Sequence, residues 1–196
     1  MKNTDHFRIA QKMAGDIAHA IDIGCKDNPL AVISVDIDFQ VNPKIVASVL
    51  NLPIKMESFK KCFFLETLEH LPINTELFAL KEINRILKQK GILILTTPHD
   101  TWIHTYLDPA YWLQGHRHYK KQRVFDFLIK AGFQVEHISV RGGCLHLLKS
   151  LYYYLITKIL GIAAPSWLLK KADKEYNFIN PNGASIIVKA VKIKSI

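Results

Sequence analysis

Short apolar runs alternate with longer segments of helical periodicity along this chain, and this alternation limits its fold more than any other feature. The runs occupy residues 18–23, 31–37, 45–49, 62–65, 92–96, 133–140 and 184–193. Short, Val- and Ile-rich runs of this kind are typical of strands buried on both faces of a parallel sheet. Because parallel strands need crossover connections, which are usually helical, the alternation predicts an α/β fold with a mostly parallel sheet.

Three segments between these runs have the periodicity of helices that bury one face. Residues 5–18 and 120–130 repeat apolar side chains every three or four positions. The clearest segment is residues 75–89, whose apolar positions fall on a single helical face: Leu77, Leu80, Ile83 and Leu87. We expect Asn74 to cap the beginning of this helix and Gly91 to end it.

The composition is that of one globular domain spanning residues 1–196. Hydrophobic residues make up 49% and charged residues 22% of the chain, and no repeat or low-complexity linker interrupts it. The three cysteines lie far apart and form no CxxC pair, so we expect neither a zinc site nor a disulfide framework. Residues 1–10 carry charges and no apolar signal core, so a cytoplasmic location is expected.

The chain carries a formal net charge of +9. A basic surface suits nucleic acid, an anionic membrane or an acidic substrate. The lysines are spread along the chain, in pairs no longer than Lys60–Lys61, which favours solvated surface over a nucleic-acid groove. No aromatic and basic recognition motif accompanies them, so nucleic acid is an unlikely partner.

Acidic residues stand at the ends of the first two predicted strands. The first strand ends in Asp22-Ile23-Gly24-Cys25 and the second in Asp36. In parallel sheets, ligands bind at the carboxyl ends of the strands. Gly24 allows the backbone to turn close to a ligand, and Asp36 can accept hydrogen bonds from both hydroxyls of a ribose. Each motif alone would equally suit a turn glycine or a helix cap, whereas the two together indicate a nucleotide-like ligand.

Segments between residues 18 and 140 resemble, in order, the motifs of the class I S-adenosylmethionine (SAM)-dependent methyltransferases. Residues 22–25 and 34–38 are similar to the two SAM-binding motifs. Residues 65–71, with the sequence LETLEHL, closely match the family's segment after the fourth strand, and three further matches follow the family order: 50–53, 82–99 and 116–133. The resemblance is to the small "methyltransferase type 11" kind of domain. It implies a Rossmann-like, seven-stranded sheet with flanking helices.

The resemblance also implies a cofactor and a set of residues that hold it. The cofactor is SAM, and the implied activity is methyl transfer to an acceptor that is a small molecule or is linked to a lipid; the motifs do not specify the acceptor. The matching positions at the strand ends are Asp22, Gly24, Cys25, Asp36, Ile37, Ser48, Val49 and Glu66.

Several positions depart from the family pattern. Lys26 replaces the glycine that usually follows, Ser48 replaces an aspartate near the adenine, and Lys60 and Lys90 replace an aspartate and a glycine. Only thirteen residues separate Asp22 from Asp36, so the first crossover helix is expected to be shortened or missing. These changes leave an alternative open, a non-catalytic methyltransferase-like binding module with a degraded cofactor motif.

Histidines are the candidates for proton transfer. A general base is needed only if the acceptor is a weakly acidic hydroxyl or a protonated amine. We name His99, after the fifth strand, and His116, in the next loop, as candidate catalytic residues because imidazole titrates near neutrality. His118 is a further candidate, while His70 is expected to pack or cap. The spacing of His104, His116 and His118 places them on no common helix face, so no metal site is expected.

Two segments are rich in aromatic and apolar residues. Residues 102–112 would form either a lid over the acceptor or part of the core. Residues 144–170 predict a helical insertion, at about 144–174, between the last two strands, with Gly161 and Pro165 dividing it into two helices. This insertion would cover the acceptor pocket or lie in a membrane interface, since its lysine-flanked apolar runs are too short to span a bilayer. Peripheral membrane contact through residues 144–170 is thus a further expectation.

Overall fold

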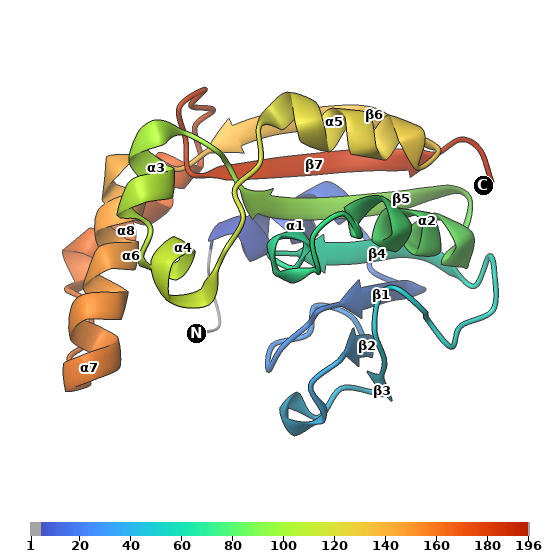
Figure 1. Cartoon of the computed structure of the whole chain (residues 1–196), viewed down its shortest axis with the longest axis horizontal. Helices are drawn as coiled ribbons and strands as arrows, with labels where there is room; N and C mark the ends of the chain where they lie inside the picture. Colours follow the sequence, from blue (N-terminus) through green and yellow to red (C-terminus); the bar gives the residue numbers. More distant parts are fainter. Residues whose placement is uncertain (1–4, 196) are drawn as a thin grey trace.

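A single seven-stranded sheet organises the molecule. The structure is a computed structural model that describes residues 5–195, with side chains described from Phe7 onward. The strand order is β3-β2-β1-β4-β5-β7-β6, and only β7 runs antiparallel to its neighbours (Figure 1). The strands are β1 (Ala20–Ile23), β2 (Ile33–Asp36), β3 (Ile45–Val46), β4 (Phe59–Leu65), β5 (Leu87–Pro98), β6 (Phe133–Arg141) and β7 (Ser185–Lys192). The predicted Rossmann-like, mostly parallel sheet is confirmed.

The two faces of the sheet are covered by different helices. Along β4, Cys62 and Phe64 point into the larger hydrophobic core, while Phe63 and Leu65 point into the smaller one. This alternation follows from the two-residue period of a strand. The larger core lies under α2 (Glu76–Ile86) and α5 (Lys121–Lys130), and the smaller one under α1 (Asp5–Ala14).

The predicted ends of the helix over 75–89 are wrong. Thr75 stands at the N-cap position, and Asn74 precedes it with φ of 67°. The helix ends at Ile86 rather than at Gly91, because Leu87 is extended and pairs with Phe59 of β4. The backbone N–H of Ser58 donates to the carbonyl of Ile86, so the neighbouring strand takes over where the helical hydrogen bonds stop.

No α-helix occurs in the first three crossovers of the described chain. The β1–β2 connection consists of turns, and the next one holds only the 3-10 turn η1 (Phe39–Val41). The expected shortening of the first crossover is therefore confirmed and extends to the next two connections. Val32 and Phe39 are exposed on this half of the sheet, where a crossover helix would otherwise cover them.

Helices gather at one end of the molecule, beyond the carboxyl ends of the parallel strands (Figure 1). They are α3 (Trp102–Leu107), α4 (Pro109–Gln114), α6 (Cys144–Tyr152), the π-helical turn η3 (Tyr153–Thr157), α7 (Lys158–Leu160) and α8 (Ser166–Tyr176). The last four connect β6 to β7. Gly161 follows α7 with φ of 71°, and Pro165 precedes α8, so both residues interrupt the helical chain. None of the helices within residues 5–195 is long and apolar enough to cross a membrane.

Candidate active site

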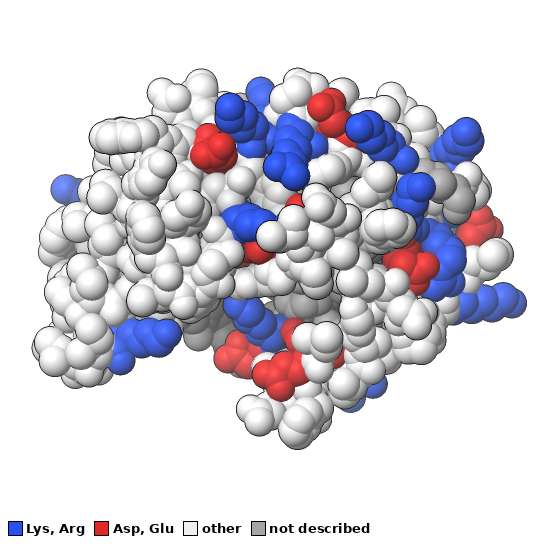
Figure 2. All heavy atoms as spheres, viewed as in Figure 1, with Lys and Arg blue, Asp and Glu red and all other residues white. Residues whose placement is uncertain are grey.

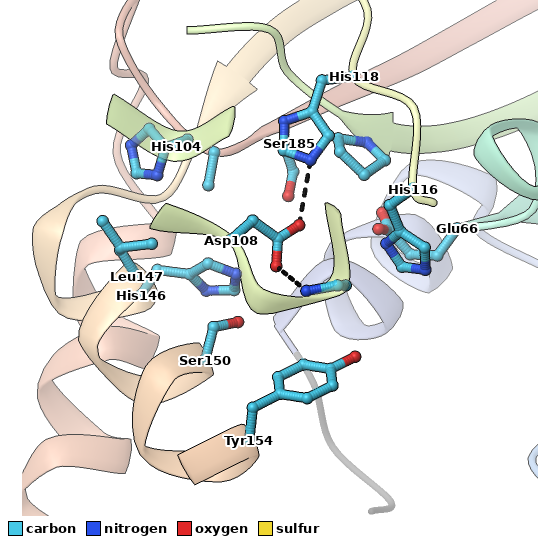
Figure 3. Close-up of a pocket in the computed structure, with 13 residues that line it drawn as sticks. Glu66, His104, Asp108, His116, His118, His146, Leu147, Ser150, Tyr154 and Ser185 are labelled. Carbon is cyan, nitrogen blue, oxygen red and sulfur yellow. Dashed lines mark hydrogen bonds and ion pairs between the residues drawn. The ribbon is translucent and has the colours of Figure 1, made fainter. Parts of the chain in front are cut away.

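Two cavities meet at Glu66, just after β4. The larger has a volume of about 590 Å³ and lies at the carboxyl ends of β1, β2 and β4. The smaller has a volume of about 140 Å³ and lies between Glu66 and the group of helices α3, α4, α6, η3, α7 and α8, which we call the helical end (Figure 3). Glu66 lines both cavities, so a group in one can approach a group in the other at this residue.

Gly24 forms a wall of the larger cavity that no other residue could form. Its φ is +73°, and an added Cβ would overlap the side chain of Thr67, with only 2.9 Å to the Thr67 Cβ. The Gly24 N–H donates to the carbonyl of Val35, and the Thr67 hydroxyl donates to the carbonyl of Leu65. Glycine is thus required both by backbone conformation and by the close approach of the turn after β4.

Asp36 presents its carboxylate at the end of β2. One oxygen accepts from the N–H of Lys26 at 2.9 Å and the other from the N–H of Asp38 at 3.0 Å. Lys26 has φ of 47°, a left-handed backbone that glycine adopts more readily than other residues. Each carboxylate oxygen can accept more than one hydrogen bond, so both remain able to bind ligand hydroxyls.

The other predicted cofactor residues divide into two groups. Ile37, Ser48 and Val49 line the larger cavity, as Gly24, Asp36 and Glu66 do. Asp22 and Cys25 are buried and are absent from the lining of both cavities.

Asp22 and Cys25 are buried under the loop after β1 and stabilise it. The Asp22 carboxylate accepts from the N–H of Leu30 at 2.7 Å, and burial raises its pKa to about 7. Burial, assisted by Asp22, raises the pKa of the Cys25 thiol to about 11, so this cysteine is not a reactive thiolate.

Two residues of α2 fix the turn after β3. A Glu82 oxygen accepts from the N–H of Leu52, and Arg85 donates to the carbonyls of Leu52 and Ile54. Arg85 also pairs with Glu82 at 2.8 Å, which lowers the pKa of Glu82. Glu82 and Arg85 lie within the motif match over 82–99, and this pair holds the segment that follows Ser48 and Val49.

Arg117 and Tyr119 hold the turn after β4, a role that the sequence did not reveal. The Arg117 guanidinium pairs with the buried Glu76 at 2.8 Å and donates to the carbonyls of Leu68 and Leu71. The Tyr119 hydroxyl donates to Glu76 at 3.1 Å. The position of Arg117 between two candidate histidines was the only available signal, because its partners lie more than forty residues away.

His116 and Glu66 form the polar wall of the smaller cavity nearest the larger one. Figure 3 shows their side chains next to each other, and each acts electrostatically on the other. Burial raises the pKa of Glu66 and lowers the pKa of His116. Glu66 Oε1 and His116 Nε2 are buried without a hydrogen-bond partner, so both can bind a polar group placed in the cavity.

Asp108 and His118 form a hydrogen-bonded pair on the opposite wall (Figure 3). His118 Nε2 donates to Asp108 at 3.0 Å, and its Nδ1 lies 3.0 Å from the Thr105 hydroxyl. Burial alone would raise the pKa of Asp108, but hydrogen bonds from His118 and from the Ala110 N–H outweigh it and lower the pKa. His118 was a candidate from the sequence, whereas Asp108, which is also the N-cap of α4, was not.

His99 is buried beside the smaller cavity but is absent from its lining. Its ring Nδ1 lies 3.0 Å from the carbonyl of Gly183, and its backbone N–H donates to the carbonyl of Ala184. Burial lowers the pKa of His99. These contacts join the end of β5 to the segment before β7, whereas His116 faces the cavity.

The remaining histidines are distributed around the site. His70 packs edge-on against His116, with ring centroids 4.3 Å apart, and its pKa is lowered to about 4 chiefly by burial. His104 lines the smaller cavity. Across residues 5–195, no group of three or more histidine, cysteine or acidic side chains is arranged to hold a metal ion.

The comparisons with known proteins agree with the fold. Residues 11–95 match the family model of a methyltransferase domain. No curated protein matches the chain. A solved structure from Thermotoga maritima, a SAM-dependent methyltransferase and possible histamine N-methyltransferase, is similar at 19% identity and a TM-score of 0.64, over 96% of this chain and 88% of that one.

Two other solved structures share the fold at similar distance. A SAM-dependent methyltransferase from Mesorhizobium loti has 13% identity and a TM-score of 0.63, over 97% of this chain and 99% of that one. The [4+2]-cyclase SpnF has 17% identity and a TM-score of 0.62, over 95% of this chain and 80% of that one.

Proposed function

We propose that the chain is a class I SAM-dependent methyltransferase that methylates a hydroxyl or amine of a small or lipid-linked acceptor held in the smaller cavity. The observation that carries this proposal is the meeting of the two cavities at Glu66.

The larger cavity suits the cofactor. Its volume of about 590 Å³ lies within the range of roughly 300–1,000 Å³ of small-molecule sites. Gly24 lines this cavity without a side chain of its own, and Asp36 offers carboxylate oxygens for ribose hydroxyls. When bound, SAM supplies a methyl group activated by a positively charged sulfur. The residues of this chain bind it, align the acceptor and handle the proton.

The smaller cavity suits an acceptor that donates hydrogen bonds. Glu66 Oε1, His116 Nε2 and His104 Nδ1 are buried there without partners. A buried polar atom without a partner costs free energy, and a hydroxyl or amine that reaches one of these atoms removes its share of that cost. The unpaired atoms therefore support an acceptor with an O–H or N–H group.

His116 is the residue that takes the acceptor's proton. Since burial lowers its pKa, the ring is uncharged at neutral pH and can accept a proton. The adjacent Glu66 stabilises the positive charge that the ring then carries. The Asp108–His118 pair holds the start of α4 beside the acceptor, and the position of His99 outside the cavity favours His116 over His99 as the base.

A lipid-linked acceptor is the form that the helical end supports. Residues 144–170 line one side of the smaller cavity through Leu147, Ser150 and Tyr154, and the same segment exposes apolar side chains outward. The polar part of such an acceptor would occupy the cavity, and its apolar part would lie along these helices at a membrane surface.

Calorimetry with S-adenosylhomocysteine tests the cofactor site. Asp36→Ala should weaken binding by about 1.5–3 kcal/mol, the usual effect of losing hydrogen bonds to a charged group. Asp126→Ala is the control, because Asp126 lies on α5 outside both cavities. Unchanged affinity in Asp36→Ala would remove Asp36 from the site, and no binding to the wild type would favour the non-catalytic module.

Transfer of a labelled methyl group from SAM to a panel of simple amines and polyols tests the base. His116→Gln should lower the rate roughly 10²- to 10⁴-fold while S-adenosylhomocysteine affinity stays within a few-fold of wild type. His137→Gln, on β6 and outside both cavities, is the matched control. An unchanged rate in His116→Gln would exclude this residue as the base.

A further inference from the structure

One end of the molecule exposes an unusual number of large apolar and aromatic side chains. We call this surface the apolar end. Its members come from α3, α4, η3, α7, the connection to α8 and the start of α8: Trp102, Ile103, Tyr106, Leu107, Trp112, Leu113, Leu155, Ile159, Leu160, Ile162 and Trp167. Trp102 is 77% exposed and Leu113 70% exposed, so these side chains do not belong to the core. Large apolar side chains exposed together at one end of a molecule are typical of a contact site.

Basic side chains predominate around the apolar end, although Lys149 pairs with Asp173 of α8 at 3.5 Å. Residues 137–172 contain no aspartate or glutamate, but they contain Arg141 and four lysines. On the α3–α4 side, Asp108 is the only acidic residue of 101–119, and it is hydrogen-bonded to His118. Figure 2 shows much of this end as uncharged surface, with basic side chains at its lower edge. The apolar end is therefore complementary to an apolar surface that carries negative charge.

Lysines and aromatic rings are paired on this surface. Lys158 lies 5.4 Å from the ring centre of Tyr154, and Lys171 lies 5.8 Å from that of Trp167. Tryptophan and tyrosine favour the level of lipid headgroups, and lysine extends toward their phosphates. Each basic residue near an anionic leaflet contributes attraction that salt screens.

We propose that the apolar end docks on an anionic lipid bilayer, with α4 and α7 lying in its surface. Because no described helix can cross a membrane, the contact is peripheral. Exposed apolar side chains beside basic ones are the pattern of helices that lie in the interface.

This docking would place the acceptor cavity at the membrane surface, a step that rests on the proposed function. Ala110 of α4 and Ser150 of α6 line the smaller cavity, and both helices belong to the helical end. The Gln114 side-chain amide donates to the Tyr154 hydroxyl at 3.2 Å, which joins α4 to η3 beside the cavity. The polar head of a membrane amphiphile would thus reach His116 without leaving the bilayer surface.

Vesicle flotation of the full chain tests the docking independently of methyl transfer. The probes are vesicles of phosphatidylcholine alone and of phosphatidylcholine with phosphatidylglycerol. We expect the protein to float with the anionic vesicles and to be released by salt, since the Debye length falls from about 10 Å at 0.1 M to about 3 Å at 1 M.

Two variants separate the contributions of apolar surface and charge. Ile159→Ser with Leu160→Ser, and Lys158→Glu with Lys171→Glu, should each lower the vesicle-bound fraction at least about tenfold, the effect of losing roughly 1.4 kcal/mol. Val32→Ser with Ile73→Ser is the matched control, because both side chains are exposed outside the apolar end. All variants should bind S-adenosylhomocysteine as the wild type does, which shows that they fold and that the cofactor site is intact.

Three results would overturn the docking. They are failure of the wild type to float with anionic vesicles, equal loss of binding in the control variant, and dimerisation through this surface without vesicle binding. If the wild type does not bind S-adenosylhomocysteine, that result counts against the proposed function, and flotation still tests the docking.

Discussion

Replacing Gly24 with alanine gives a direct test of how β1 and the turn after β4 approach each other. Two costs add in this variant. An L-residue at φ of +73° costs roughly 1–2 kcal/mol, and forcing a methyl group into a packed site costs about 1–3 kcal/mol. The second cost arises because the added Cβ lies 2.9 Å from the Thr67 Cβ and closer still to the ends of that side chain. We expect Gly24→Ala to lower the free energy of unfolding by about 2–5 kcal/mol.

A matched glycine separates the two costs. Gly15 has φ of +65°, and an added Cβ there would meet nothing within 4 Å, so Gly15→Ala reports the backbone cost alone. The double variant Gly24→Ala with Thr67→Ala should recover part of the difference, because the outer atoms of Thr67 are then absent. The recovery is incomplete, since the two Cβ atoms still crowd each other.

Urea unfolding of the four proteins gives these free energies, and calorimetry with S-adenosylhomocysteine shows whether the cofactor site survives. Gly24→Ala should also abolish measurable binding, because the relaxed loop would move into the space lined by Gly24. The reasoning would be refuted if Gly24→Ala cost no more than Gly15→Ala, or if the Thr67 change gave no recovery.

Two further variants probe the site. Ser48→Asp should tighten S-adenosylhomocysteine binding roughly tenfold in calorimetry, because a carboxylate accepts a stronger hydrogen bond from the adenine amino group than a hydroxyl does. The Ser48 hydroxyl now accepts from the N–H of Leu50. Weaker binding in the variant would show that this wall of the cavity has diverged. Asp22 has its pKa raised from 3.8 to about 7, so its contribution to stability is complete below about pH 4 and is lost as the pH rises to 7, by up to roughly 4 kcal/mol. Asp22→Asn should remove this loss, so the variant should have a higher free energy of unfolding than the wild type at pH 8 but not at pH 4. Parallel curves of unfolding free energy against pH for the two proteins would contradict this.

The position of the larger cavity could be predicted from the sequence because few features determine it. Apolar runs fixed which segments form strands, and parallel strands bring their carboxyl ends to one edge of the sheet. Gly24, Asp36 and Ser48 lie at or just after the ends of three different strands, so they meet at the larger cavity whatever the details of their side chains.

Contacts between distant loops could not be predicted in the same way. Arg117 pairs with Glu76 across forty-one positions, and no periodicity links the two. Asp108 looked like an ordinary residue before a proline until the fold brought it to His118. The end of α2 was misplaced because pairing of Leu87 with β4 overrides the helical pattern, which continues past it.

The missing crossover helices also bear on how firmly the cofactor half of the sheet is held. β2 and β3 have four and two residues, and β3 pairs with β2 alone, so few buried contacts oppose their separation from the sheet. Regions of this kind open more readily than the global unfolding free energy implies. A ligand that contacts Asp36 and the 47–50 turn binds only the closed form, so it takes over part of the covering role of the absent helices. Cofactor binding and local folding of this edge are then linked by mass action, and the edge is most ordered when the enzyme is loaded.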